Sequence, residues 1–236
     1  MNEIRIIGVR GIPEIGEGDD LATLIVEGSG EGAIRSDDII VVAHKAVSKA
    51  EGRVVPGSDR RGAALAESAR ILRRQGEMVI SETRHGFVCA NAGVDASNVE
   101  GDNVVLLPLD PDLSARRLRA RLHHVSGVDV GIIISDTFGR AWRIGQTNVA
   151  IGVAGLLPFV DYRGTTDAQG RDLSATLICI ADEIAGAAEM VMGKTTGVCA
   201  AIVRGAPVRA GRGAATEIVR PPPRRPLPLS DRKVVR

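Results

Sequence analysis

The chain is organised around one stretch, which reads Arg84-His-Gly-Phe-Val-Cys-Ala-Asn-Ala-Gly-Val-Asp-Ala-Ser-Asn98. It opens with a short apolar segment of strand type. Ala92-Gly93 then breaks the strand into a polar turn that carries Asp95, Ser97 and Asn98. The stretch therefore predicts a rigid strand whose end presents several oxygen atoms.

A second stretch of the same kind follows, where Asp129-Val-Gly-Ile-Ile-Ile-Ser135 is a buried-strand run that ends in Asp136-Thr137. If the two strand ends meet, Asp95 and Asp136 converge, with Thr137 and Asn98 nearby. Such an all-oxygen site suits Mg²⁺ or Mn²⁺, and the two aspartates become the candidate catalytic groups. Taken singly, each aspartate is explained as well by capping of the turn or helix that follows it.

Composition narrows the function classes. The 236 residues are 44% hydrophobic, which is enough for one large domain or two interlocked small ones. The 30 basic and 29 acidic residues leave a net charge of +1, which argues against bulk attraction to nucleic acid or membrane. The aromatic content of 2% argues against stacking platforms for single strands. A small polyanionic ligand remains compatible, because it needs only local charge.

The cysteines indicate the compartment. Cys89, Cys179 and Cys199 lie singly in apolar surroundings, which predicts buried thiols in a reducing compartment and disfavours zinc. The N-terminus lacks a signal pattern, and no window approaches 18 uninterrupted apolar residues. We therefore expect a soluble cytoplasmic protein with no membrane partner.

Strand and helix patterns alternate irregularly, which predicts a mixed α/β (α+β) fold without a clean doubly wound pattern. The predicted strands are 4–9, 37–42, 77–80, 103–108, 129–135 and 198–203, and the predicted helices are 21–26, 62–75, 112–124 and 173–192. The helix over 173–192 is apolar on most faces, which predicts burial, with a subunit interface as one place for it. The proline-rich stretch 206–236 is predicted to be a partly extended C-terminal extension.

Three segments suggest ligand contacts. Ser48 and Lys49 follow the predicted strand 37–42 in a polar turn, where backbone N–H groups and an ammonium suit phosphate; a solvated lysine is the simpler alternative. P-loop glycine spacing is absent. Trp142, the only tryptophan, predicts either a core anchor or a group that packs on a planar ligand beside neighbouring arginines. The charged loop 161–172 is typical of a functional loop.

Five motifs in order carry a family resemblance. They are Gly11-Ile-Pro-Glu14, Val47-Ser-Lys-Ala-Glu-Gly52, Ala92-Gly-Val-Asp-Ala-Ser-Asn98, Ser135-Asp-Thr-Phe-Gly139 and Val191-Met-Gly193. From about residue 4 to 205 the chain closely resembles the coenzyme F420-0:γ-glutamyl ligases, known as CofE, and the N-terminal part of FbiB. The resemblance implies GTP-dependent addition of L-glutamate to the deazaflavin coenzyme F420-0. It also implies two divalent cations, a potassium requirement and an intertwined α/β homodimer.

The resemblance also implies roles for single residues. Asp95 and Asp136 match the family's metal aspartates, and Thr137 matches a ligand of the second metal. The matches to GTP contacts are Gly11, Ile12, Pro13, Glu14, His44, Lys49, Asn98, Met192, Gly193, Lys194 and Thr195. Lys194 is a departure, because many members carry a glutamate or glutamine ligand near this position. A protonated ammonium cannot coordinate a cation. Either backbone, water and phosphate hold the second metal, or Lys194 contacts phosphate itself.

The implied chemistry is amide formation through an acyl phosphate. The γ-phosphate of GTP activates the acceptor's terminal carboxylate, and the amine of glutamate then displaces phosphate, with charge neutralisation as the protein's main contribution. The residues alone leave two alternatives open. One is a two-metal phosphohydrolase in which the same aspartates activate water, and the other is a nucleotide-sensing module.

Overall fold

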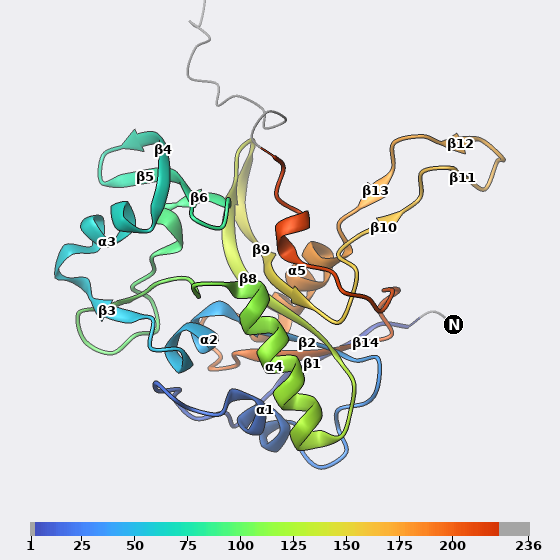
Figure 1. Ribbon diagram of the computed structural model, residues 1–236, viewed down its shortest axis with the longest axis horizontal. Coiled ribbons are helices and arrows are strands. Elements are labelled where there is room, and N and C mark those ends of the chain that lie inside the picture. Colours follow the sequence, from blue (N-terminus) through green and yellow to red (C-terminus); the bar gives the residue numbers. More distant parts are fainter. Residues whose placement is uncertain (1–2, 222–236) are drawn as a thin grey trace, which may run out of the picture.

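The computed structural model describes residues 3–221, and its centre is a five-stranded sheet (Figure 1). The strand order is β1 (Arg5–Val9), β14 (Ala200–Arg204), β2 (Ile39–Ala43), β8 (Gly131–Arg140) and β9 (Arg143–Ala154). Only β2 and β8 run parallel in this sheet, and the other neighbours are antiparallel. The mixed α/β prediction is confirmed.

Both faces of the central strands are buried, which explains their uninterrupted apolar runs. Successive side chains of a strand point to opposite faces. Ile40 and Val42 of β2 therefore pack with α1 (Leu21–Ser29) and α4 (Pro111–Ser126), while Ile39 and Val41 pack with α5 (Ile180–Met192) on the other face. The sheet is thus a rigid platform between two layers of helices.

The layer formed by α1 and α4 is fixed by caps and by one ion pair. Asp20 caps α1 by accepting from the Thr23 backbone N–H at 3.4 Å, and it also accepts from Arg121 of α4 at 2.7 Å. Asp110 caps α4 through the Leu113 N–H at 2.8 Å. Gly127 ends α4 in the left-handed conformation that glycine adopts most easily.

A smaller lobe follows α2 (His44–Ala50). It contains β3 (Val54–Pro56) paired with β7 (Asn103–Val105), the helix α3 (Arg60–Ala66), and a three-stranded sheet of β4 (Ser68–Gln75), β5 (Met78–Thr83) and β6 (Val88–Ala90). The predicted helix 62–75 is therefore wrong beyond Ala66. Residues 68–75 pair with β5 through two register shifts, so strand pairing overrides the helical spacing of their apolar residues.

The long helix predicted in the second half of the chain is shorter in the structure. The predicted helix 173–192 begins only at Ile180, and the residues before it belong to a ribbon. In that ribbon β10 (Val160–Asp161) pairs with β13 (Leu177–Ile178), and β11 (Thr165–Thr166) pairs with β12 (Asp172–Leu173). Figure 1 shows this ribbon projecting from the body. The predicted burial of the helix holds for one side, because Ala185 and Ala188 are buried while Met190 is 76% exposed.

The C-terminal stretch is described only to Pro221. Leu156 and Ala210 form an isolated bridge, and the side chain of Asp112 accepts from the Ala215 N–H at 2.7 Å, so this part packs against α4. The remainder of the extension, 222–236, lies outside the described residues. Across 3–221, no helix has the length and apolar character needed to cross a membrane.

Candidate functional site

A cavity of about 760 Å³ opens where the ends of several elements meet. Its walls come from the segment after β1, the start of α2, the turn after β6, strands β8 and β9, and the end of α5 with the turn that follows. The predicted site residues that line it are Ile12, Pro13, Glu14, His44, Lys49, Asp95, Asn98, Asp136, Thr137, Met192, Gly193, Lys194 and Thr195. Gly11 is not among the lining residues. It precedes Ile12 with a φ of 79°, a conformation that favours glycine.

Asp95 stands where the organising stretch turns away from β6. Asn91, Ala92 and Gly93 all have positive φ, which explains the abrupt end of the strand. The backbone of Asp95 then bridges to Val105, and its carboxylate accepts from the Ser97 N–H at 2.7 Å. The capping interpretation is therefore confirmed for Asp95, yet the same carboxylate lines the cavity.

A lysine that sequence reasoning missed holds the Asp95 carboxylate. Lys45 Nζ lies 2.9 Å from Asp95 Oδ2 and also donates to Ser97 Oγ. Burial alone would raise the pKa of Asp95, but the hydrogen bonds from Lys45 and Ser97 outweigh it, so the pKa lies below its ordinary value. Asp95 therefore stays ionised. In the sequence, only the position of Lys45 directly after the predicted contact His44 points to a role in the site.

Asp136 lies inside β8, not at its end, because the strand continues to Arg140. The prediction that this strand finishes in an aspartate is therefore wrong. A register shift between Ile134 and Ser135 precedes it, and bulges of this kind often re-aim side chains beside active sites. The carboxylate accepts from the Thr137 N–H at 2.6 Å and lies 3.2 Å from Nε2 of His44.

His44 is 2% exposed, and neither of its ring nitrogens has an aligned hydrogen-bond partner within residues 3–221. The 3.2 Å contact with Asp136 is thus close in distance but poorly directed. Burying a polar ring without partners is unfavourable. The imidazole therefore retains hydrogen-bonding capacity for a ligand in the cavity that it lines.

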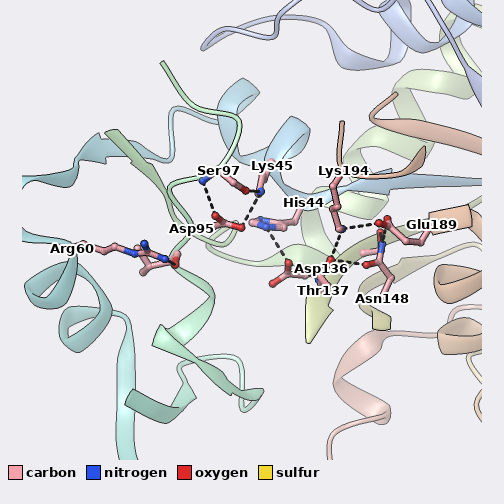
Figure 2. Close-up of polar contacts among 12 residues, drawn as sticks. His44, Lys45, Arg60, Asp95, Ser97, Asp136, Thr137, Asn148, Glu189 and Lys194 are labelled. Carbon is pink, nitrogen blue, oxygen red and sulfur yellow. Dashed lines mark hydrogen bonds and ion pairs between the residues drawn. The ribbon is translucent and has the colours of Figure 1, made fainter. Parts of the chain in front are cut away.

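Lys194 closes a ring of polar contacts on the opposite wall (Figure 2). Its ammonium donates to Thr137 Oγ1 at 2.6 Å and lies 2.9 Å from Glu189 Oε1. Thr137 Oγ1 in turn donates to Asn148 Oδ1 at 2.6 Å, and Asn148 Nδ2 donates to Glu189 Oε2 at 2.9 Å. Glu189 and Asn148 are site residues that the sequence analysis missed. Each lies on an element whose pattern of apolar residues indicates only that the element packs against the core.

The basic side chains of the cavity face its acidic ones. Lys49 pairs with Glu14, so the predicted nucleotide loop and the predicted phosphate lysine are in contact. The solvated-lysine alternative is therefore wrong, because Lys49 is largely buried and lines the cavity. Cys199 also lines it, and burial raises the pKa of its thiol, which disfavours a thiolate ligand.

The donor set fits a hard divalent cation. Carboxylate, hydroxyl and amide oxygens are available from Asp95, Asp136, Thr137 and Asn148. In the part of the chain that the structure describes, no group of three or more His, Cys, Asp or Glu side chains is placed to hold an ion alone. Mg²⁺ is usually bound by one or two carboxylates together with substrate phosphates.

Two other predicted features lie away from these residues. Trp142 is 70% exposed at the turn between β8 and β9, so the core-anchor interpretation is wrong. The charged loop 161–172 forms part of the projecting ribbon, and none of its residues lines the cavity.

Comparison with known proteins identifies the family. The family described as F420-0:Gamma-glutamyl ligase matches residues 10–64 and 58–205. The coenzyme F420:L-glutamate ligase of Methanothermobacter thermautotrophicus is 45% identical, covering 86% of this chain and 90% of its own length. The ligase of the same name from Archaeoglobus fulgidus is 40% identical over 92% of this chain and 93% of its own. The chain therefore belongs to the F420-0:gamma-glutamyl ligase family.

Proposed function

We propose that this protein is a GTP-dependent ligase that joins L-glutamate to coenzyme F420-0. One observation carries the proposal beyond family membership: the cavity gathers the carboxylates of Asp95 and Asp136 with the ammonium groups of Lys45, Lys49 and Lys194. A triphosphate and a carboxylate repel each other when brought together. Fixed positive charge and bound cations around them are what such a reaction requires.

Asp95, Asp136 and Thr137 are the residues that would hold two divalent cations, Mg²⁺ or Mn²⁺, and the potassium requirement of the resemblance is part of the same proposal. Bound there, the cations would neutralise developing charge on the phosphoryl group. The oxygen donors already described support this assignment. The low pKa of Asp95 supports it as well, because a carboxylate must be ionised to serve as a ligand.

The chain's own groups account for positioning. Lys49, Lys45 and Lys194 would contact phosphate oxygens, and the buried ring of His44 would donate to the nucleotide. A carboxylate oxygen of the acceptor then attacks the γ-phosphorus, the bond from that phosphorus to the bridging oxygen breaks, and GDP leaves. The amine of glutamate attacks the resulting acyl phosphate carbon, a C–N bond forms, and inorganic phosphate leaves.

The amine must lose a proton during the second step. Asp95 is a poor base, because its pKa lies below the ordinary value. Efficient proton acceptors have a pKa near the operating pH. A phosphate oxygen of the departing group is therefore the acceptor that we favour, and the protein's contribution is to hold the amine against the carbonyl carbon.

We also infer a homodimer. Met190 on α5 and Ile4 before β1 are 76% and 54% exposed and are thus available to a partner. The intertwined arrangement itself comes from the family resemblance.

The function is tested by measuring GDP and phosphate release with Mn²⁺ present. The ligase requires both L-glutamate and F420-0 for release at the full rate. Release at that rate from GTP alone would favour the two-metal phosphohydrolase. Binding of GTP with no release under any combination of substrates would favour the nucleotide-sensing module.

A further inference from the structure

The tip of the β8–β9 hairpin presents two large apolar side chains to solvent. Trp142 is 70% exposed and Ile144 is 102% exposed. Figure 1 shows β8 and β9 rising beyond the other strands of the five-stranded sheet. Neighbouring exposed apolar side chains at one such point indicate a contact surface for a ligand or partner.

The same tip is positively charged. Arg140 and Arg143 are cross-strand partners that flank Trp142, and Arg140 Nη2 donates to the Ile144 carbonyl oxygen at 3.1 Å, which orders the turn. Within residues 3–221 neither guanidinium forms an ion pair with a carboxylate. An exposed aromatic side chain in a turn that two unneutralised arginines flank in the sequence suits a planar ligand that carries negative charge.

The tip is continuous with the cavity. Gln146 and Asn148 of β9 line the cavity, and a register shift with Gly145 at a φ of 91° separates them from Ile144 at the tip. Gln146 pairs with Gly139, and Asn148 pairs with Thr137, so the hairpin carries cavity wall and tip on one rigid element. From Thr137 to the end of β8 at Arg140 the chain is extended over roughly 10 Å, and the turn that carries Trp142 follows directly.

We propose that this tip, residues 140–144, binds the planar ring system of the acceptor by stacking on Trp142, while the arginines attract its anionic linker. The inference rests on the proposed function, in which the acceptor joins a deazaflavin ring to a reactive carboxylate through a phosphate-containing linker. With that carboxylate beside Thr137, the rest of the acceptor would follow the same hairpin towards the tip. Charge complementarity favours this occupant, because its linker is anionic, whereas a symmetric contact with the tip of a second copy would bring the same arginines together.

Fluorescence tests the contact without turnover, because Trp142 is the only tryptophan in the chain. F420-0 is added to the protein without GTP or glutamate, and emission intensity and lifetime are recorded. Stacking on the ligand abolishes Trp142 emission in the protein molecules that have bound F420-0. The emission that remains comes from unbound protein and keeps its original lifetime. Energy transfer over a longer distance instead shortens the lifetime, and that result would overturn the contact. A double variant with Trp142→Phe and Tyr162→Trp moves the reporter to the ribbon and serves as the control for energy transfer.

Kinetics test the consequence. Trp142→Ala should raise KM for F420-0 roughly tenfold, as expected for the loss of one aromatic stacking contact, and leave KM for GTP unchanged. Trp142→Phe should recover most of the loss because it keeps a ring. Tyr162→Ala, an exposed aromatic on the ribbon, is the matched control and should change neither constant.

The outcomes separate the two claims. Normal ligation by the wild type with an unchanged KM for F420-0 in Trp142→Ala contradicts the tip contact alone. Static quenching without any glutamylated product contradicts the ligase and leaves the tip contact standing. The molar mass of both chains is also measured by light scattering. If the wild type is a dimer and Trp142→Ala is a monomer, the tip contacts a second copy of the chain, and the proposal is overturned.

Discussion

The ammonium of Lys194 donates a 2.6 Å hydrogen bond to the hydroxyl of Thr137, the residue proposed to hold a second cation. Glu189 Oε1 lies 2.9 Å from the same ammonium, so a positive charge already stands among the oxygens on this wall. The amine cannot itself coordinate a metal while protonated. Lys194 is therefore placed to take over part of the charge neutralisation that a second cation would supply.

This contact predicts how Lys194 variants respond to GTP and to metal. Lys194→Ala should raise KM for GTP by roughly tenfold or less, as expected for one partly exposed charged contact, and make turnover depend more steeply on Mn²⁺ concentration. Lys194→Glu supplies a carboxylate beside Glu189 and should tighten Mn²⁺ binding, measured by calorimetry. Lys194→Met is the control, because it keeps a long side chain without a charge or an oxygen ligand. An unchanged KM and an unchanged Mn²⁺ titration in Lys194→Ala would make Lys194 a solvated turn residue.

Asp95 and Asp136 are predicted to be needed for turnover but not for folding. Asp→Asn at either position should lower turnover by orders of magnitude, since a lost cation removes several kcal/mol of transition-state stabilisation. Circular dichroism should remain native, because Asn can still accept from the Ser97 or Thr137 backbone N–H. Asp129→Asn, on the surface beside Arg119, is the matched control. A near-normal rate in a natively folded Asp95→Asn or Asp136→Asn chain refutes the assignment.

The Asp20–Arg121 pair predicts part of the acid sensitivity of the fold. The hydrogen bond from Arg121 is the largest cause that lowers the pKa of Asp20 to about 2. Because the folded pKa is below the unfolded one, the stabilisation is present above the ordinary aspartate range and is lost as the pH falls towards about 2. The free energy of unfolding is measured by urea titration at successive pH values, and Arg121→Gln should reduce its decrease at acid pH. An equally steep decrease in the variant and the wild type would contradict the prediction.

Asp182 predicts the opposite dependence. Burial raises its pKa above the ordinary value, with the Ala150 N–H opposing the shift at 2.9 Å. Its contribution is therefore fully present below the unfolded pKa and is lost as the pH rises through the folded pKa. Asp182→Asn keeps an oxygen acceptor for Ala150 and should flatten stability between the ordinary aspartate range and neutral pH. A variant whose melting temperature falls over that interval as steeply as that of the wild type would rule this out.

Four of the five strands of the central sheet are predicted from the sequence, because burial on both faces leaves long apolar runs, as in Ile39–Ala43. The fifth, β9, is missed because its first part, residues 143–148, is polar and contains glycine. The residues alone point to Asp95, Asn98, Asp136, Thr137 and Lys49 at the cavity, and the family resemblance supplies its other predicted lining residues. Residues 68–75 are different, because their apolar spacing suits a helix and only pairing with β5 decides otherwise. The register of that pairing is a tertiary property.

Glu189 and Asn148 show a second limit. In the sequence, the pattern around Glu189 indicates a charged residue on the surface of a helix, and Asn148 is a single polar residue before an apolar run. Their role appears only when α5 packs across β9 and brings the two side chains within 2.9 Å. Asp136 was correctly picked out as a cavity residue, but the length of β8 beyond it depends on pairing with β9.

The paired aspartates and lysines of this cavity are proposed to serve amide formation. Mass spectrometry of the deazaflavin after incubation with GTP, L-glutamate and Mn²⁺ distinguishes this reaction from simple GTP hydrolysis. We expect F420-0 with at least one added glutamyl residue, formed by the wild-type chain and absent with Asp136→Asn. Unmodified F420-0 in the presence of complete GTP hydrolysis would contradict it.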